Sequence, residues 1–175
     1  MFSVKKLVYT AILIALGVVL PLTLHAVPNS GQIFLPMHIP VLLSGLICGF
    51  PYSLACGVLT PLVSHLVTGM PGPAYLVPMI CELAVYGLTA SLLFRLIRTK
   101  NVYIRIYIAL VGSMVAGRVI YGIMKALIFS AGEYSMQLWV TSMFVTALPG
   151  IAIQLVLIPA AVILLRRARV IDLEA

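Results

Sequence analysis

Six long apolar runs dominate the sequence, and only short connections separate them. A helix that crosses a hydrocarbon core of about 30 Å needs about 20 consecutive apolar residues. Charged residues make up 9% of the chain, whereas a soluble domain carries roughly 25%. Because so few polar residues cannot cover a water-soluble core, the sequence indicates an integral membrane protein.

The runs predict an all-α integral membrane protein, a compact six-transmembrane-helix bundle that forms one membrane domain over residues 1–175. The first run follows Lys5 and Lys6 and lacks a convincing signal-peptide cleavage site, so we interpret it as the first helix. The second and third runs are short and are joined by the turn-forming segment GFPYS, which predicts a tight helical hairpin. The predicted helices cover residues 7–24, 34–50, 52–67, 74–96, 103–129 and 138–165.

The basic residues set the predicted orientation. With six helices, all but Arg118 and Lys125 of the 11 Lys and Arg residues fall on one side of the membrane. The positive-inside rule makes that side cytoplasmic, so both termini are expected in the cytoplasm. The basic clusters lie between apolar runs and not along one face, which argues against nucleic acid as a partner.

Once the basic clusters are set aside, three charged residues remain within predicted helices: Glu82, Arg118 and Lys125. Such groups are costly in a bilayer and mark functional sites. At 1.5 Å per residue, Glu82 lies about 12 Å below the outer end of its helix, while Arg118 and Lys125 lie about 22 Å and 33 Å above the cytoplasmic end of theirs. All three are therefore predicted in the outer half of the bundle, where helical spacing puts Arg118 and Lys125 on one face.

Other polar and aromatic residues are predicted at the same level, which indicates a chamber that opens outward. Whether Glu82 pairs with Arg118 or contacts a ligand stays open at this point, as do the roles of His25 and His65. The residues predicted to bind a substrate are Asn29, Gln32, His38, Glu82, Tyr86, Arg118, Tyr121, Lys125 and Trp139.

Sequence motifs for catalysis are missing from the chain. It has no zinc-protease, serine-hydrolase or nucleotide-binding motif, and its three cysteines lack zinc-site spacing. We therefore expect a protein that is not an enzyme, with no metal site and no cofactor of its own.

Two small residues four apart in the first helix, Ala11 and Ala15, form a pattern that lets another helix approach closely. They lie in TAILIALGVVLP, and two further blocks follow: LPMHIPVLLSGLICGFPYSLACGVLTPLVSHLVTGMP and CELAVYGLTASLLFR. Over essentially its whole length, the chain resembles the substrate-binding (S) components of energy-coupling factor (ECF) vitamin transporters.

The resemblance implies a multi-pass protein of the prokaryotic cell membrane that captures a vitamin on the extracellular side. It also implies partners: Ala11 and Ala15 would dock on a transmembrane coupling subunit, which carries two ATPase subunits. ATP would then be hydrolysed on the partner subunits, in keeping with the absence of a nucleotide motif here.

The charges suggest the substrate. Arg118 and Lys125 against Glu82 leave one net positive charge, which favours a small ligand with a carboxylate, and pantothenate suits this best. A neutral heteroaromatic of the pyridoxine or hydroxymethylpyrimidine type is the alternative, stacked on tyrosine or tryptophan, and it gains if Glu82 pairs with Arg118. A self-sufficient small-anion channel or facilitator and a ligand-free scaffold are the competing function classes.

We predict that bulky replacements of Ala11 and Ala15 impair cellular uptake but leave substrate binding nearly intact, because helix packing and the chamber use separate surfaces. Uptake by cells and binding by the purified protein would be compared for the same Ala11→Leu/Ala15→Leu variant. Equal losses in the two assays would contradict separate surfaces.

Overall fold

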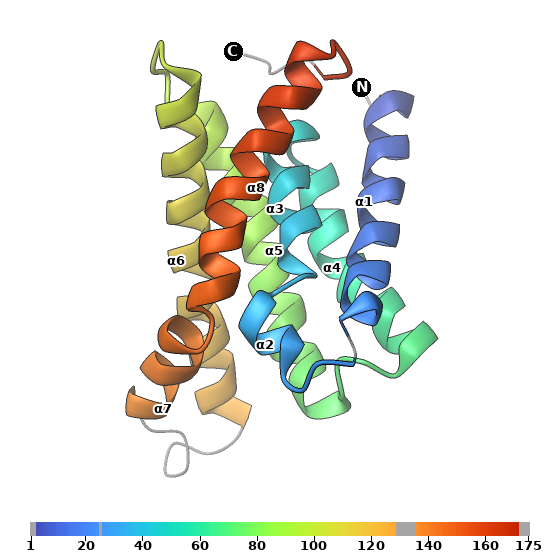
Figure 1. The fold of residues 1–175 in the computed structure, drawn as a ribbon, viewed down its shortest axis with the longest axis vertical. Coiled ribbons are helices and arrows are strands. Elements are labelled where there is room, and N and C mark those ends of the chain that lie inside the picture. Colours follow the sequence, from blue (N-terminus) through green and yellow to red (C-terminus); the bar gives the residue numbers. More distant parts are fainter. Residues whose placement is uncertain (1–2, 25, 129–135, 172–175) are drawn as a thin grey trace.

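The computed structural model describes residues 3–24, 26–128 and 136–171, without the side chains of Met136 and Leu138, and all regular secondary structure within them is helical (Figure 1). His25, the predicted helix end at Phe129, and the connection up to residue 135 lie outside the described residues. The elements are α1 (Val4–Thr23), α2 (Ser30–Phe34), α3 (His38–Ile47), α4 (Tyr52–Thr68), α5 (Pro73–Leu96), α6 (Val102–Ile128), α7 (Met136–Val140), the π-helical turn η1 (Thr141–Val145) and α8 (Leu148–Arg167).

Five segments are long and apolar enough to cross a membrane: α1, α2 with α3, α5, α6 and α8. Helix α4 is apolar too, but at 17 residues it is shorter than the other spans. The fold is thus a helical membrane bundle, as the sequence predicts. Six membrane crossings and cytoplasmic termini stay predictions.

The helix predicted over residues 34–50 is broken in the structure. Leu35 has a left-handed backbone (φ 50°) and ends α2, and Pro36 follows it. Proline has no N–H to continue a helical ladder, so α3 starts only at His38. Residues 30–33, which fall between two predicted helices, form the short helix α2 together with Phe34.

The helix predicted over residues 138–165 is also divided, into α7, η1 and α8. In the π-helical turn η1, the Thr146 N–H donates to the Thr141 carbonyl five residues earlier, at 2.9 Å. Pro149 then sits in the first turn of α8, where its missing N–H costs little. The final helix runs two residues further than predicted, to Arg167.

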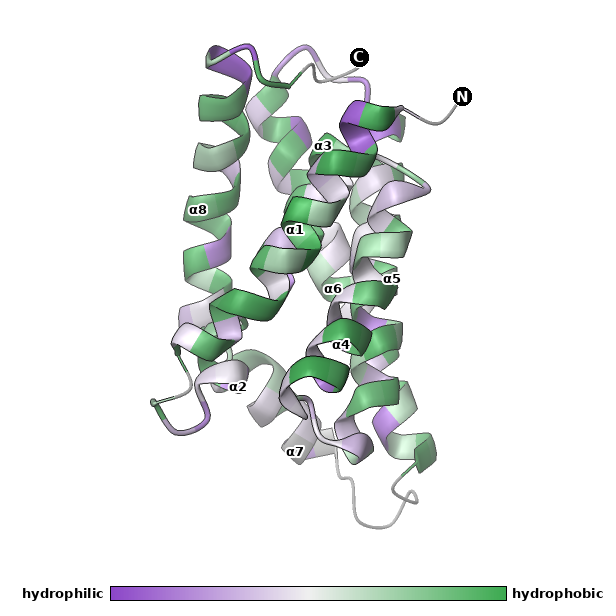
Figure 2. Ribbon diagram, turned by 90° about the vertical axis from the view of Figure 1, so that its right-hand side faces the viewer, coloured by the Kyte–Doolittle hydropathy of each residue, from purple (hydrophilic) through white to green (hydrophobic). Residues whose placement is uncertain are grey.

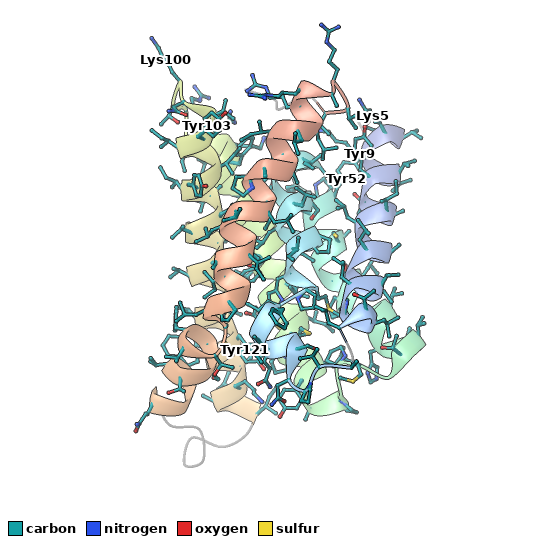
Figure 3. All side chains as sticks on the ribbon, in the orientation of Figure 1. Lys5, Tyr9, Tyr52, Lys100, Tyr103 and Tyr121 are labelled. Atoms are coloured by element: carbon teal, nitrogen blue, oxygen red, sulfur yellow. The ribbon has the colours of Figure 1, made fainter. Side chains whose placement is uncertain are left out.

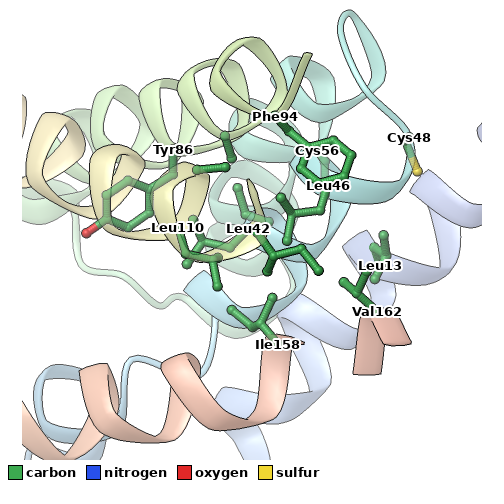
Figure 4. Close-up of a cluster of buried hydrophobic side chains, with 14 of the residues drawn as sticks. Leu13, Leu42, Leu46, Cys48, Cys56, Tyr86, Phe94, Leu110, Ile158 and Val162 are labelled. Atoms are coloured by element: carbon green, nitrogen blue, oxygen red, sulfur yellow. The ribbon is translucent and has the colours of Figure 1, made fainter. Parts of the chain in front are cut away.

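Helix α3 lies at the centre of the bundle and packs against α1, α4, α5, α6 and α8. Its apolar side chains Val41, Leu42 and Leu46 are almost completely buried and belong to the hydrophobic core. Figure 4 shows Leu42 and Leu46 in this core together with Tyr86 and Ile158. Ten residues of helix extend about 15 Å, half the hydrocarbon thickness. The central helix is therefore too short to fill the thickness of the hydrocarbon core, and space remains beyond both of its ends.

Helix α1 lies at the edge of the bundle. In its most apolar window only 22% of the residues are buried, against 61% for the span that contains α3. Most of its ribbon has the colour of hydrophobic residues in Figure 2, and its exposed residues include Ala11 and Ala15. A face of this composition suits lipid or a packed helix, not water.

One end of the bundle is strongly basic, and we call it the basic end. Helix α1 begins there, α5 ends and α6 begins there, and α8 ends there (Figure 1). Lys5 and Lys100 mark this end in Figure 3, while Tyr121 lies toward the opposite end. The basic clusters, which whole helices separate in the sequence, thus lie at the same end of the bundle.

Helices α4 and α5 approach closely at Gly57. A Cβ atom on this residue would collide with the backbone carbonyl of Leu83, and backbone cannot move aside as a flexible side chain can. Small residues commonly permit such contacts between membrane helices.

We predict that Gly57→Ala lowers the free energy of unfolding by about 1–3 kcal/mol, as overpacking typically does. Gly31→Ala is the matched control, since a Cβ there meets nothing within 4 Å and Gly31 has no positive φ. Thermal unfolding of both variants in detergent would check this. Equal melting temperatures would show that the α4–α5 interface can relax.

Candidate functional site

A cavity of about 700 Å³ opens at the end of the bundle opposite the basic end. The end of α1, the segment from Val27 to His38, the α4–α5 connection, the outer part of α5, the end of α6 and η1 line it. Its size falls within the range of small-molecule sites, about 300–1,000 Å³. We refer to it below as the cavity.

Three buried ionisable residues form the floor of the cavity. His38, Glu82 and Arg118 come from α3, α5 and α6 and are only 2%, 3% and 2% exposed. His38 Nε2 lies 3.4 Å from Glu82 Oε2, so these two form the ion pair of the floor when His38 is protonated. Within the described part of the chain, Glu82 makes no ion pair with Arg118.

Arg118 has unusually weak partners for a buried guanidinium. Nη1 donates to the Met143 sulfur at 3.6 Å, and Cζ lies 5.9 Å from the centre of the Phe144 ring. No described residue accepts a hydrogen bond from Nε. A buried charge normally requires a counter-charge and saturated hydrogen bonds, so Arg118 is poised to receive an acidic group.

Lys125 lies two turns of α6 beyond Arg118 and also lines the cavity. Its Nζ sits 4.0 Å from the centre of the Tyr75 ring, a cation–π contact between α6 and α5. Tyr121, 8% exposed, lines the wall between the two cations. Arg118, Tyr121 and Lys125, on the predicted face of α6, therefore all line the cavity.

Helix α2 forms one side of the rim, with exposed Asn29 and Gln32. Contacts from α8 hold it in place: Gln154 Nε2 donates to the Leu35 carbonyl at 3.3 Å. A Cβ at Gly150 would lie 2.6 Å from the Ile33 carbonyl, which shows how closely the two helices approach. The chain at the break after α2 is thus held by contacts with α8.

The α4–α5 connection forms another part of the rim. Ser64 Oγ donates to the Met70 carbonyl at 2.7 Å, and His65 Nδ1 lies 2.8 Å from the Pro71 carbonyl. His65 does not line the cavity. Its contact to Pro71 indicates that it holds the connection in place.

Two of the predicted substrate-binding residues do not line the cavity: Tyr86 and Trp139. Tyr86 is fully buried beneath the floor, with its ring 5.2 Å from that of His38 in an edge-on arrangement. Trp139 lies against α6 outside the cavity lining, and its indole N–H donates to the Arg118 carbonyl at 3.2 Å. Both side chains position floor residues, and we assign neither of them to the ligand. Residues that do line it are Asn29, Gln32, His38, Glu82, Arg118, Tyr121 and Lys125.

The structure adds contributors that the sequence did not single out. Met143 contacts Arg118 and lines the cavity, while Gln154 anchors the rim. A methionine and a glutamine in an apolar run carry no signal of such roles. Among the described residues, no group of three His, Cys, Asp or Glu side chains could hold a metal ion.

Comparison with known proteins gives one positive finding. The family model described as ECF transporter, substrate-specific component, matches residues 5–162. No curated protein and no solved structure matches the chain.

We predict that His38→Leu lowers the free energy of unfolding of the ligand-free protein by about 3 kcal/mol, because it leaves the buried Glu82 carboxylate without its partner. Adding Glu82→Gln to this variant should restore most of the loss. Thermal unfolding in detergent measures both. A double variant as unstable as the single one would mean that His38 stabilises the floor by packing alone.

Proposed function

The chain belongs to the ECF transporter substrate-specific component family, and on this premise we propose that its cavity binds a small vitamin with a carboxylate, of which pantothenate is the best candidate. The family makes the chain the vitamin-type substrate-binding subunit of a multi-pass membrane transporter, which works with an ECF module. The substrate itself, the binding residues and the energy source are our proposals.

The observation that carries the proposal is the state of Arg118. It is 2% exposed, and no described carboxylate lies within ion-pair distance of it. Since Glu82 is engaged by His38 instead, the condition that would favour a neutral heteroaromatic ligand is not met. A ligand carboxylate at Arg118 would supply the counter-charge that none of the described residues provides.

The rest of the cavity suits the remainder of such a molecule. Lys125 is the second cation on the same wall, and Asn29 and Gln32 offer amide groups at the rim. Hydroxyl and amide groups of a pantothenate-like ligand can hydrogen-bond to these amides and to the His38–Glu82 pair. The aromatic residues available for stacking at this level are Tyr75, Tyr86, Tyr121 and Trp139, and only Tyr75 and Tyr121 line the cavity.

Transport would require partners. We propose that the exposed Ala11 and Ala15 face of α1 docks on a transmembrane coupling subunit and that two ATPase subunits hydrolyse the ATP. We also place the protein in the prokaryotic cell membrane with both termini in the cytoplasm, in agreement with the basic end.

The test is a vitamin panel on detergent-purified protein, read out as a rise in melting temperature. A ligand at 100 times its Kd stabilises the folded state by about 2.7 kcal/mol. We expect pantothenate to produce such a rise. Its alcohol analogue, in which a hydroxymethyl group replaces the carboxylate, should bind at least about 30-fold more weakly, since truncating one partner of a buried charge pair costs about 2 kcal/mol or more.

Arg118→Met should lose the response to pantothenate without lowering the stability of the ligand-free protein, because it removes a buried charge that has no counter-ion among the described residues. Arg105→Met is the matched control. Arg105 is also buried, but it donates to the Phe94 carbonyl and stacks on the Phe94 ring near the basic end. It should lower stability and retain binding. A response to pyridoxine-type ligands alone would overturn the carboxylate proposal.

A further inference from the structure

Methionine is concentrated around the cavity. Four of the eight methionines in the sequence line it: Met37, Met70, Met79 and Met143. They come from the residue before α3, the α4–α5 connection, α5 and η1. Met37 is 5% exposed, while Met79 and Met143 are partly buried. Several walls of the cavity therefore contain a methionine.

The methionine side chain is unusually adaptable. It is unbranched, has three rotatable bonds and carries a polarisable sulfur, so it can repack against partners of different shape. Proteins that bind many partners use surfaces rich in methionine for this reason. Branched side chains, by contrast, have few rotamers. The walls of this cavity can therefore change shape around the part of a ligand that lies away from Arg118, which we call its body.

The buried polar groups of the cavity lie at its floor. His38, Glu82 and Arg118 are at most 3% exposed, so a ligand that leaves one of them unpaired loses much of its affinity. Asn29 and Gln32, at the rim, are exposed. Water can pair with an exposed amide when a ligand offers no partner there, so the lost hydrogen bond costs little. The floor thus selects the carboxylate end of a ligand, and the rim selects its body weakly.

The cavity is also larger than pantothenate needs. Its volume of about 700 Å³ lies in the upper half of the range of small-molecule sites, about 300–1,000 Å³, which hold drug-sized ligands. Pantothenate is smaller than such ligands. A larger body can therefore be accommodated while the carboxylate stays at the floor.

From this geometry we propose that the cavity binds a class of small carboxylic acids that share the carboxylate and differ in the body. Arg118 holds the carboxylate, and the methionine-containing walls fit the body. The class depends on the proposed function, because it requires a carboxylate at Arg118. Pantothenate is then one member of the class and not the sole ligand.

N-acyl-β-alanines test this class, because pantothenate is itself an acylated β-alanine. The N-pivaloyl, N-hexanoyl and N-benzoyl compounds keep one carboxylate arm and present a compact, a linear and a planar body. Adding or removing a single methylene in a fitted apolar pocket changes binding about 10–200-fold. We expect the three Kd values, measured by isothermal titration calorimetry on the detergent-purified full chain, to lie within about tenfold of one another.

Matched leucine variants show whether methionine causes this tolerance. Met37→Leu/Met79→Leu conserves volume but makes two walls stiffer, so the three Kd values should spread over about 30-fold or more. Met114→Leu/Met124→Leu is the control, since neither residue lines the cavity. Met114 is 5% exposed, as Met37 is, and Met124 is partly buried, as Met79 is. This control should keep the narrow spread, and circular dichroism shows whether both variants are folded.

Several results would overturn the proposal. Strong selection of one acyl-β-alanine by the wild-type protein, or an equal spread in the two double variants, would mean that the methionines do not adapt. Binding of pantothenate without the acyl-β-alanines would remove the class and leave the proposed function intact. If none of the acids binds, pantothenate included, the proposed function fails as well.

A neutral ligand checks the shared carboxylate. The primary amide of N-benzoyl-β-alanine keeps the body but has no negative charge. It should bind at least about 30-fold more weakly than the acid, because Arg118 then lacks its charged partner. Equal affinities of amide and acid would show that the body alone drives binding, which contradicts a class defined by its carboxylate.

Discussion

The length of α3 is the constraint on which the rest of the structure depends. A helix of ten residues at the centre of a bundle cannot by itself span the hydrocarbon core, whereas its neighbours α1, α5, α6 and α8 can. The depth that it leaves unfilled becomes a cavity above His38 and a recess beyond Ile47. Irregular chain at such depth is tolerated only against protein or a polar hollow, and the Gln154 contact to the Leu35 carbonyl meets that requirement.

The chemistry of the cavity follows from how few charges the bundle contains. Glu82 could have neutralised Arg118, but α3 presents His38 to it instead. Met143 and Phe144 then surround the guanidinium with a weak acceptor and an aromatic ring. The π-helical turn that carries these two residues is a local distortion of a kind often found at functional sites.

Hydropathy and helical spacing predicted much of this architecture. The helix expected over residues 52–67 is observed as Tyr52–Thr68, and the face with Arg118, Tyr121 and Lys125 lines one cavity. The break at Leu35 could not be predicted, because leucine has no preference for left-handed backbone. Nor could the place of Trp139, since the π-helical turn η1 that follows it changes the phase of α7 relative to α8.

Tyr86 illustrates a different limit. It lies one turn from Glu82 on the same face, as spacing predicts, but the other helices decide whether that face is open or covered. Helix α3 covers it, and the ring of His38 lies against Tyr86. Contacts between residues 38, 82 and 118 depend on the three-dimensional packing of three helices, which no local pattern encodes.

The lack of a counter-ion for Arg118 among the described residues affects the dissociation rate of a ligand as well as its affinity. A bound carboxylate could leave only by restoring a buried cation that has no counter-ion in the described part of the chain, so the cost of separating the two charges falls on the dissociation step. Differences in affinity between related complexes arise mostly in dissociation rates. A ligand held in this way would have a long residence time, and a transport cycle could release it quickly only by first admitting water or another anion to the guanidinium.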